Sequence, residues 1–101
     1  MTKTAIYRWN GRYFGFIYRD RFFDARSAYL GWVDGNEGWR KNGTYLGELV
    51  DGNYIIRRMN MATRARRAMR ATPAKPAIPA RRAKRAGRAR RAGWVDALDE
   101  F

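Results

Sequence analysis

The tripeptides Tyr13-Phe14-Gly15, Tyr29-Leu30-Gly31 and Tyr45-Leu46-Gly47 follow one another at a spacing of sixteen residues. Two Asn-Gly pairs, at 10–11 and 42–43, lie just before the first and third of them, and Asn-Gly is a strong signal for a two-residue hairpin turn. A unit of this length is too short for a pair of helices, but it accommodates two short strands and two turns. The repeat therefore predicts an all-β fold made of antiparallel hairpins.

We expect about seven short strands, at residues 6–8, 13–18, 22–24, 29–33, 38–41, 45–50 and 54–57. Arg19-Asp20 and two Asp-Gly-Asn sequences mark turns between them, and Ser27 falls in a turn as well. The Gly in each tripeptide would weaken a strand unless another backbone comes close or the strand bends. Two interpretations follow: equivalent strands meet near a common axis where only Gly fits, or each Gly marks a β-bulge.

Charge and aromatic residues divide the chain into unlike parts. Residues 1–56 carry eight basic and six acidic side chains and thirteen of the fifteen aromatic residues, whereas residues 57–101 carry fourteen basic and three acidic side chains. Only the first part has the composition to build a core. We therefore expect a hairpin-repeat domain at 1–58, a basic Arg/Ala/Pro tail at 59–92 and a C-terminal Trp/Phe acidic peptide at 93–101.

The composition argues against several classes of function. The chain has no Cys and no His, so the common transition-metal ligands and nucleophile–base pairs are missing. The longest uncharged run, residues 27–33, is far too short to cross a bilayer. We expect a non-enzymatic, cytoplasmic protein with no metal and no cofactor. Trp9, Trp32, Trp39 and the recurring Tyr residues are expected in the core before any ligand surface.

The repeat, its Asn-Gly and Asp-Gly-Asn turns, a tail with Pro73, Pro76 and Pro79, and a Trp-containing C-terminus together resemble the four-fold beta flower domain proteins of bacteria. The resemblance covers residues 5–57 and extends loosely to 73–79 and 93–101. It implies a small all-β fold of hairpins around a pseudo-four-fold axis, with no established chemistry. The tail departs from the family, because it is rich in Arg where uncharged, Pro-rich spacers would be expected.

The tail has a period of its own. Alanine recurs every third residue from Ala62 to Ala92, and three prolines at 73, 76 and 79 share that spacing. Three residues per turn is the period of polyproline II, and Pro excludes a helix there in any case. The Ala- and Arg-rich flanks favour helix by propensity, but their charges repel. We expect the flanks to be disordered alone and to become ordered on an anion; a tolerated low-complexity expansion is the alternative.

Fourteen cations lie within 57–91, with no acid between Asp51 and Asp96. Arginine, which binds phosphate through a planar pair of donors, accounts for twelve of them. Such arms typically neutralise a polyanion without reading its sequence. RNA is favoured, since Arg-rich disordered segments commonly fold on it. The expected nucleic-acid-binding residues are Arg57, Arg58, Arg64, Arg66, Arg67, Arg70, Lys75, Arg81, Arg82, Lys84, Arg85, Arg88, Arg90 and Arg91.

The final nine residues differ from the tail. Trp94, Leu98 and Phe101 are spaced for one face of a short helix, with acidic residues on the other sides. Three outcomes are expected for them: they dock into the groove of a partner protein, they fold back over the hairpins, or their acidic residues pair with the arginines of the tail. Strand edges also allow homo-oligomers. The leading hypothesis is an RNA-binding protein whose C-terminal peptide docks a partner; the alternative is a protein–protein assembly module in which the tail is a spacer presenting residues 94–101.

Overall fold

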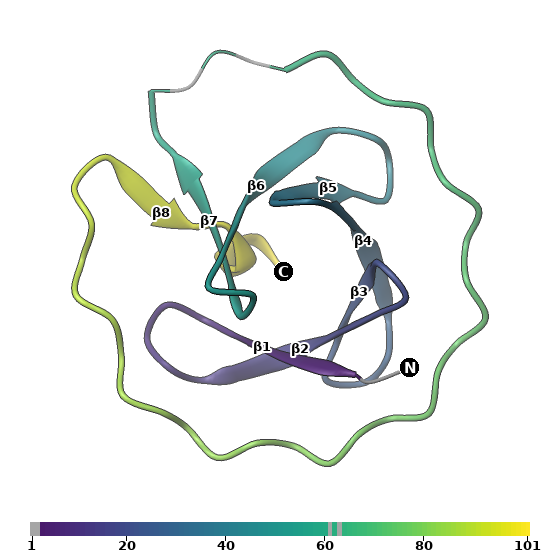
Figure 1. Cartoon of the computed structure of the whole chain (residues 1–101), viewed down its shortest axis with the longest axis horizontal. Coiled ribbons are helices and arrows are strands. Elements are labelled where there is room, and N and C mark those ends of the chain that lie inside the picture. Colours follow the sequence, from purple (N-terminus) through teal and green to yellow (C-terminus); the bar gives the residue numbers. More distant parts are fainter. Residues whose placement is uncertain (1–2, 61, 63) are drawn as a thin grey trace.

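The computed structural model describes residues 3–60, 62 and 64–101. One antiparallel sheet of eight strands, each paired with its neighbours in sequence, forms the molecule (Figure 1). The strands are β1 (Thr4–Tyr7), β2 (Tyr13–Tyr18), β3 (Arg21–Asp24), β4 (Tyr29–Asp34), β5 (Glu37–Arg40), β6 (Tyr45–Val50), β7 (Tyr54–Arg58) and β8 (Trp94–Asp96). A 3-10 helix, η1 (Ala97–Glu100), follows β8. The predicted all-β antiparallel fold is confirmed, with an eighth strand that the sequence did not predict.

Each Tyr-x-Gly tripeptide contains a β-bulge. In the first repeat Tyr7 lies opposite Tyr13 and Ile6 lies opposite Gly15, so Phe14 is the extra residue. The register shifts at the same point opposite the second and third tripeptides. A bulge bends its strand and redirects a side chain, and both Phe14 and Leu46 thereby join the buried core. The bulge interpretation of the repeat is therefore confirmed.

Close backbone contact also explains the glycines of the tripeptides. A Cβ added to Gly15 would lie 1.9 Å from the carbonyl oxygen of Phe23, and one added to Gly31 would lie 1.9 Å from that of Trp39. These carbonyls belong to the adjacent strand of the same sheet. The predicted close approach is present, but the prediction of equivalent strands meeting at a common axis is wrong.

The sheet curls until its hairpins surround a centre (Figure 1). Backbone hydrogen bonds join successive hairpins, from Val33 N–H to Asp20 O (2.9 Å) and from Leu49 N–H to Asn36 O (2.7 Å). At the closing point Tyr7 N–H donates to Asn53 O at 2.8 Å, and the Asn53 side chain donates to Ala5 O at 2.7 Å. The turn between β6 and β7 thus fastens the last part of the ring to the first.

The core occupies the middle of this ring. Its buried members are Ile6, Phe14, Phe22, Leu46, Ile55, Ala97 and Leu98. Two of the seven come from η1, which lies at the centre in the view of Figure 1. Residues from the C-terminal peptide therefore complete a core that the repeats alone leave open.

Left-handed backbone conformations occur where the sequence predicts turns. Arg19 and Asp20 have φ of 51° and 61°, as expected for a two-residue hairpin turn, and Ser27 has φ of 65°. Ser27 N–H donates to Asp24 O at 3.0 Å, which closes its turn. No helix among the described residues is long and apolar enough to cross a membrane.

Candidate nucleic-acid interface

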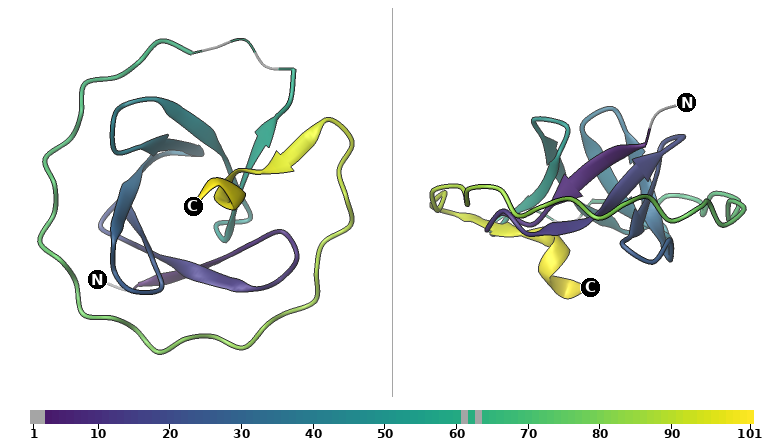
Figure 2. Two further views of the ribbon diagram at one scale, coloured as in Figure 1. Left: turned by 180° about the vertical axis from the view of Figure 1, so that it is seen from behind. Right: turned by 90° about the horizontal axis from the view of Figure 1, so that it is seen from below.

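Residues 64–92, which we call the belt, connect β7 to β8 by running around the outside of the hairpin ring (Figures 1 and 2). Neither helix nor strand occurs within these residues. The side view in Figure 2 shows the belt as an extended chain at the rim of the flattened molecule. The disorder expected for the flanks of the Pro segment is not confirmed, because the belt follows the module along its length.

Three side-chain columns run along the belt. The first contains only Arg and Pro, at Arg64, Arg67, Arg70, Pro73, Pro76, Pro79, Arg82, Arg85, Arg88 and Arg91. The second contains only Ala, from Ala65 to Ala92. The third is mixed and holds the exposed cations Arg66, Lys75, Arg81, Lys84 and Arg90. An extended chain with about three residues per turn places each column along one side.

Arginines of the first column stack on aromatic rings of the module. In residues 64–70, the first sector of the belt, the guanidinium carbons lie over ring centroids as follows: Arg64 over Tyr45 at 4.2 Å, Arg67 over Trp39 at 4.2 Å and Arg70 over Trp32 at 5.2 Å. Such cation–π contacts contribute roughly 0.5–1 kcal/mol each when exposed. Trp32 and Trp39 are buried as predicted, but belt arginines help to cover them.

Acidic side chains reinforce the first sector. Arg67 pairs with Asp34 at 2.7 Å and with Glu37 at 3.0 Å, and Arg64 also pairs with Glu37. The hydrogen bond from Arg67 lowers the pKa of Asp34 below its ordinary value. Two of the four cations of this sector, Arg64 and Arg67, are thus paired with carboxylates of the module beneath them.

The far part of the belt stacks in the same way. Arg85 lies 3.9 Å from the Tyr7 centroid, and Arg88 lies 4.7 Å from that of Tyr54. Arg88 also pairs with Asp51 at 2.6 Å. Burial raises the pKa of Tyr54, but hydrogen bonds from Arg85 and Arg88 outweigh this effect and leave the pKa lowered. These contacts cluster at the point where the ring of hairpins closes.

Two turn glycines set the register of the belt. Arg67 N–H donates to Gly43 O at 2.8 Å, and Arg85 N–H donates to Gly11 O at 3.0 Å. Both glycines have φ of 92°, and a Cβ on either would lie about 2 Å from the carbonyl oxygen of the arginine that it binds. Only Gly allows this approach, so the Asn-Gly turns serve the belt as well as the hairpins.

The C-terminal peptide does not form the single helix that its spacing predicted. Trp94 lies in β8, opposite Arg58 on β7, and Leu98 is fully buried in the core. Phe101 lies 6.1 Å from the rings of Phe14 and Phe22 and remains 40% exposed. Of the three outcomes expected for this peptide, the structure has it folded over the hairpins.

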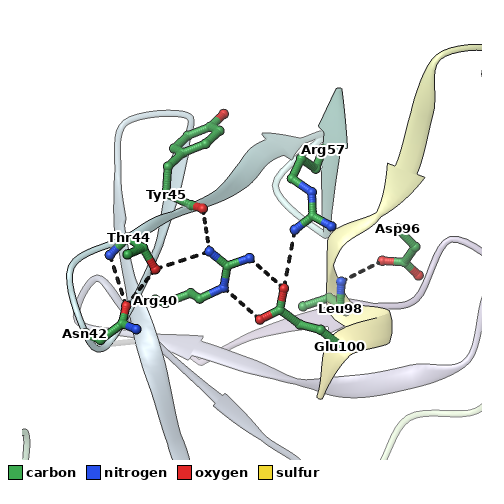
Figure 3. Close-up of polar contacts among 8 residues, drawn as sticks. All are labelled: Arg40, Asn42, Thr44, Tyr45, Arg57, Asp96, Leu98 and Glu100. Carbon is green, nitrogen blue, oxygen red and sulfur yellow. Dashed lines mark hydrogen bonds and ion pairs between the residues drawn. The ribbon is translucent and has the colours of Figure 1, made fainter. Parts of the chain in front are cut away.

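Ion pairs hold η1 in place. Glu100 accepts two hydrogen bonds of 2.7 Å from Arg40 and one of 3.3 Å from Arg57 (Figure 3). The Arg40 bond lowers the pKa of Glu100. Asp96 caps the helix by accepting from Leu98 N–H at 3.1 Å. Burial raises the pKa of Asp96, against the effect of its backbone donors.

The structure separates the fourteen predicted nucleic-acid-binding residues into three sets. Arg57 and Arg58 lie on β7, where they contact Glu100 and the Trp94 ring. The first-column arginines other than Arg82 stack on aromatic rings of the module, whereas Arg82 and the third-column cations are exposed without a recorded ring contact in the described residues. Sequence reasoning found the alanine period but missed the Arg/Pro column beside it, which is the signal for a docked face. Comparison of the chain with family models, curated proteins and solved structures found no match, so the resemblance to four-fold beta flower proteins stays an expectation.

Proposed function

We propose that the protein is a non-enzymatic nucleic-acid-binding protein that contacts phosphates through the third column of the belt. The observation that supports this proposal is that one set of belt residues contacts the module while another set is exposed to solvent. Six of the seven first-column arginines, all but Arg82, stack on aromatic rings of the module and hold the belt extended. The backbone that carries the exposed cations is therefore already ordered, and its ordering entropy is not lost again when a ligand binds. An arm whose cations are already ordered binds a polyanion at lower entropic cost than a disordered one.

The shape of the molecule favours a single strand. The molecule measures 37 × 36 × 20 Å, and the belt follows its rim, which is convex (Figure 1). Duplex DNA is stiff on this scale, with a persistence length of about 50 nm, and would contact such a rim over a short arc only. A single strand can follow the curvature. RNA is the favoured ligand, because most single-stranded nucleic acid in a cell is RNA.

In this proposal the C-terminal peptide stabilises the fold and does not dock a partner. Leu98 belongs to the core, and β8 belongs to the sheet, so neither is available without unfolding. The contacts between belt and module likewise give no support to a tail that acts as a spacer. These contacts therefore favour a nucleic-acid-binding protein over an assembly module with a spacer tail.

Binding of a fluorescein-labelled, U-rich RNA to the full-length protein, followed by fluorescence anisotropy over a salt series, tests the proposal. The logarithm of the binding constant should fall linearly with the logarithm of the salt concentration, with a slope of about −0.7 for each phosphate neutralised on a single strand. An affinity independent of salt, or no binding at about 50 mM salt, would contradict it.

A further inference from the structure

The two ends of the belt meet equivalent parts of the repeat. Gly43 and Gly11 lie thirty-two residues apart and bind belt residues that lie eighteen apart, Arg67 and Arg85. Trp39, whose ring contacts Arg67, and Tyr7, whose ring contacts Arg85, are also thirty-two residues apart. Residues 82–88, which we call the second sector, therefore repeat the docking of the first sector on an earlier hairpin.

The charges beneath the two sectors differ. Asp34 and Glu37 pair with Arg64 and Arg67 of the first sector, but the residue thirty-two positions before Glu37 is Ala5. Arg12 takes the place that Thr44 occupies in the later repeat. The second sector thus repeats the ring contact and the glycine contact at Arg85, with one recorded acidic partner, Asp51 on Arg88, and with an additional cation, Arg12, nearby.

A hollow of about 550 Å³ lies at this place, within the roughly 300–1,000 Å³ typical of small-molecule sites. Its lining includes Arg12, Arg26, Arg81, Arg82, Lys84 and Phe101. All six are exposed, and no acidic partner is recorded for the five cations in the part of the chain that the structure describes.

Two further lining residues are already engaged. Arg8 donates to Leu98 O and to Asp99, both at 3.1 Å, and therefore holds η1. Asp24, the acid among the lining residues, accepts from the backbone N–H groups of Arg26 and Ala28 at 2.8 and 3.0 Å, which fixes the adjacent turn. The guanidinium and ammonium groups of the other cations are available to a ligand.

We infer that this hollow binds one nucleotide unit of a single-stranded nucleic acid, with the phosphate on Arg12, Arg81, Arg82 and Lys84 and the base against Phe101. Arginine side chains bind phosphate through paired donors, and an exposed aromatic ring offers a face for any base. The first sector differs, because Asp34 and Glu37 pair with its Arg64 and Arg67. The inference rests on the proposed function and assigns it a principal site.

Two matched triple variants of the full-length chain test the phosphate part. Arg12→Gln, Arg81→Gln and Lys84→Gln together remove three charges from the hollow; Arg66→Gln, Lys75→Gln and Arg90→Gln together remove three exposed charges from elsewhere on the belt. With the same labelled RNA, the hollow variant should lose about tenfold more affinity than its control. Equal losses would overturn the hollow as a site while leaving the proposed function intact. Absence of RNA binding by the parent protein would contradict both.

Phe101→Leu tests the base contact. This substitution keeps an apolar side chain against Phe14 and Phe22 but removes the stacking face. Affinity for the RNA should fall about tenfold, in line with the ~1–3 kcal/mol that base stacking contributes, while affinity for inorganic polyphosphate should not change. Equal loss for both ligands, or loss for neither, would overturn the contact between Phe101 and a base. Thermal melting of each variant checks that the fold is retained.

Discussion

The first and second sectors of the belt dock alike and differ in charge. Each stacks arginines on aromatic rings and binds the carbonyl of an Asn-Gly turn through an arginine N–H. In the first sector, Asp34 and Glu37 pair with Arg64 and Arg67, whereas in the second sector Asp51 pairs with Arg88 alone. The same docking geometry therefore carries more paired arginines in one place than in the other, and the proposed function assigns the second-sector cations without a recorded acidic partner to phosphate.

Gly43→Ala should disrupt the contact between the first sector and the Asn-Gly turn, and it should have the largest effect of the variants on stability. The new Cβ would lie 2.0 Å from Arg67 O on a backbone with φ of 92°, so the belt must move or the turn must distort. We expect the free energy of unfolding to fall by about 2–4 kcal/mol, measured by urea denaturation. Gly35→Ala is the matched control, because its positive φ is similar in kind but no atom lies within 4 Å of its Cβ. Equal losses at both positions would show that belt contact adds nothing.

Ala5→Glu should make the second sector resemble the first. Ala5 occupies the position that Glu37 holds thirty-two residues later, so the new carboxylate is expected to pair with the second-sector arginines. RNA affinity should fall about tenfold at low salt, and less as salt screens the charges. Ala5→Gln is the neutral control in the same anisotropy assay. If Gln weakens binding as much as Glu, charge at this position is not the cause.

Glu100→Gln tests a second pair of equivalent positions in the repeat, the two arginines that bind η1. Arg40, which binds Glu100, and Arg8, which binds Asp99, are also thirty-two residues apart. Because the pKa of Glu100 is lowered in the fold, its carboxylate stabilises the protein above its unfolded pKa, and this contribution is lost as pH falls through the folded value. We expect a loss of about 1 kcal/mol at neutral pH, which shrinks as the pH falls below the ordinary pKa of a Glu side chain and disappears below the lowered pKa that Glu100 has in the fold.

Asp99→Asn is the control for that experiment. The Asp99 side chain is 71% exposed, so its pair with Arg8 should contribute less than the pair of Glu100 with Arg40. Chemical denaturation at neutral and acidic pH measures both. A Glu100→Gln deficit that stays constant down to acidic pH would mean that the loss does not come from the charge.

Glu37→Gln gives the smallest effect and works in the opposite direction to Ala5→Glu. It frees Arg64 and Arg67 from one carboxylate, so the first sector should gain some attraction for phosphate. We expect RNA affinity to rise about threefold at low salt. Glu48→Gln removes an equal charge without a recorded ion pair in the described part of the chain, and it should change the affinity less. Equal gains would indicate net charge alone.

The hairpins were predictable because their signals are local. The Tyr-x-Gly period, the Asn-Gly turns and the bulge at Phe14 all depend on neighbours within one repeat. The eighth strand and the central position of Leu98 were not predictable, because Trp94 reaches β7 only after thirty-five intervening residues. A three-residue strand next to such a segment carries too little pattern to indicate its partner.

For the candidate site too, the sequence predicted local features of the belt but not its contacts with distant residues. Its cations and its extended Pro segment followed from composition and period, but its docking depends on aromatic rings distant in sequence. Arg85, for example, lies over Tyr7, and Arg12 shares the hollow with Lys84. The unbroken Arg/Pro column from Arg64 to Arg91 was present in the sequence as a sign of a docked face.

The position of η1 has a consequence for biosynthesis. The hairpins emerge from the ribosome first, yet their shared interior stays open until Ala97 and Leu98 arrive at the centre. During translation the growing polypeptide therefore exposes unfinished apolar surface and a strongly cationic stretch together, beside a ribosome made largely of RNA. The core of the ring can therefore close only after Leu98 has left the exit tunnel.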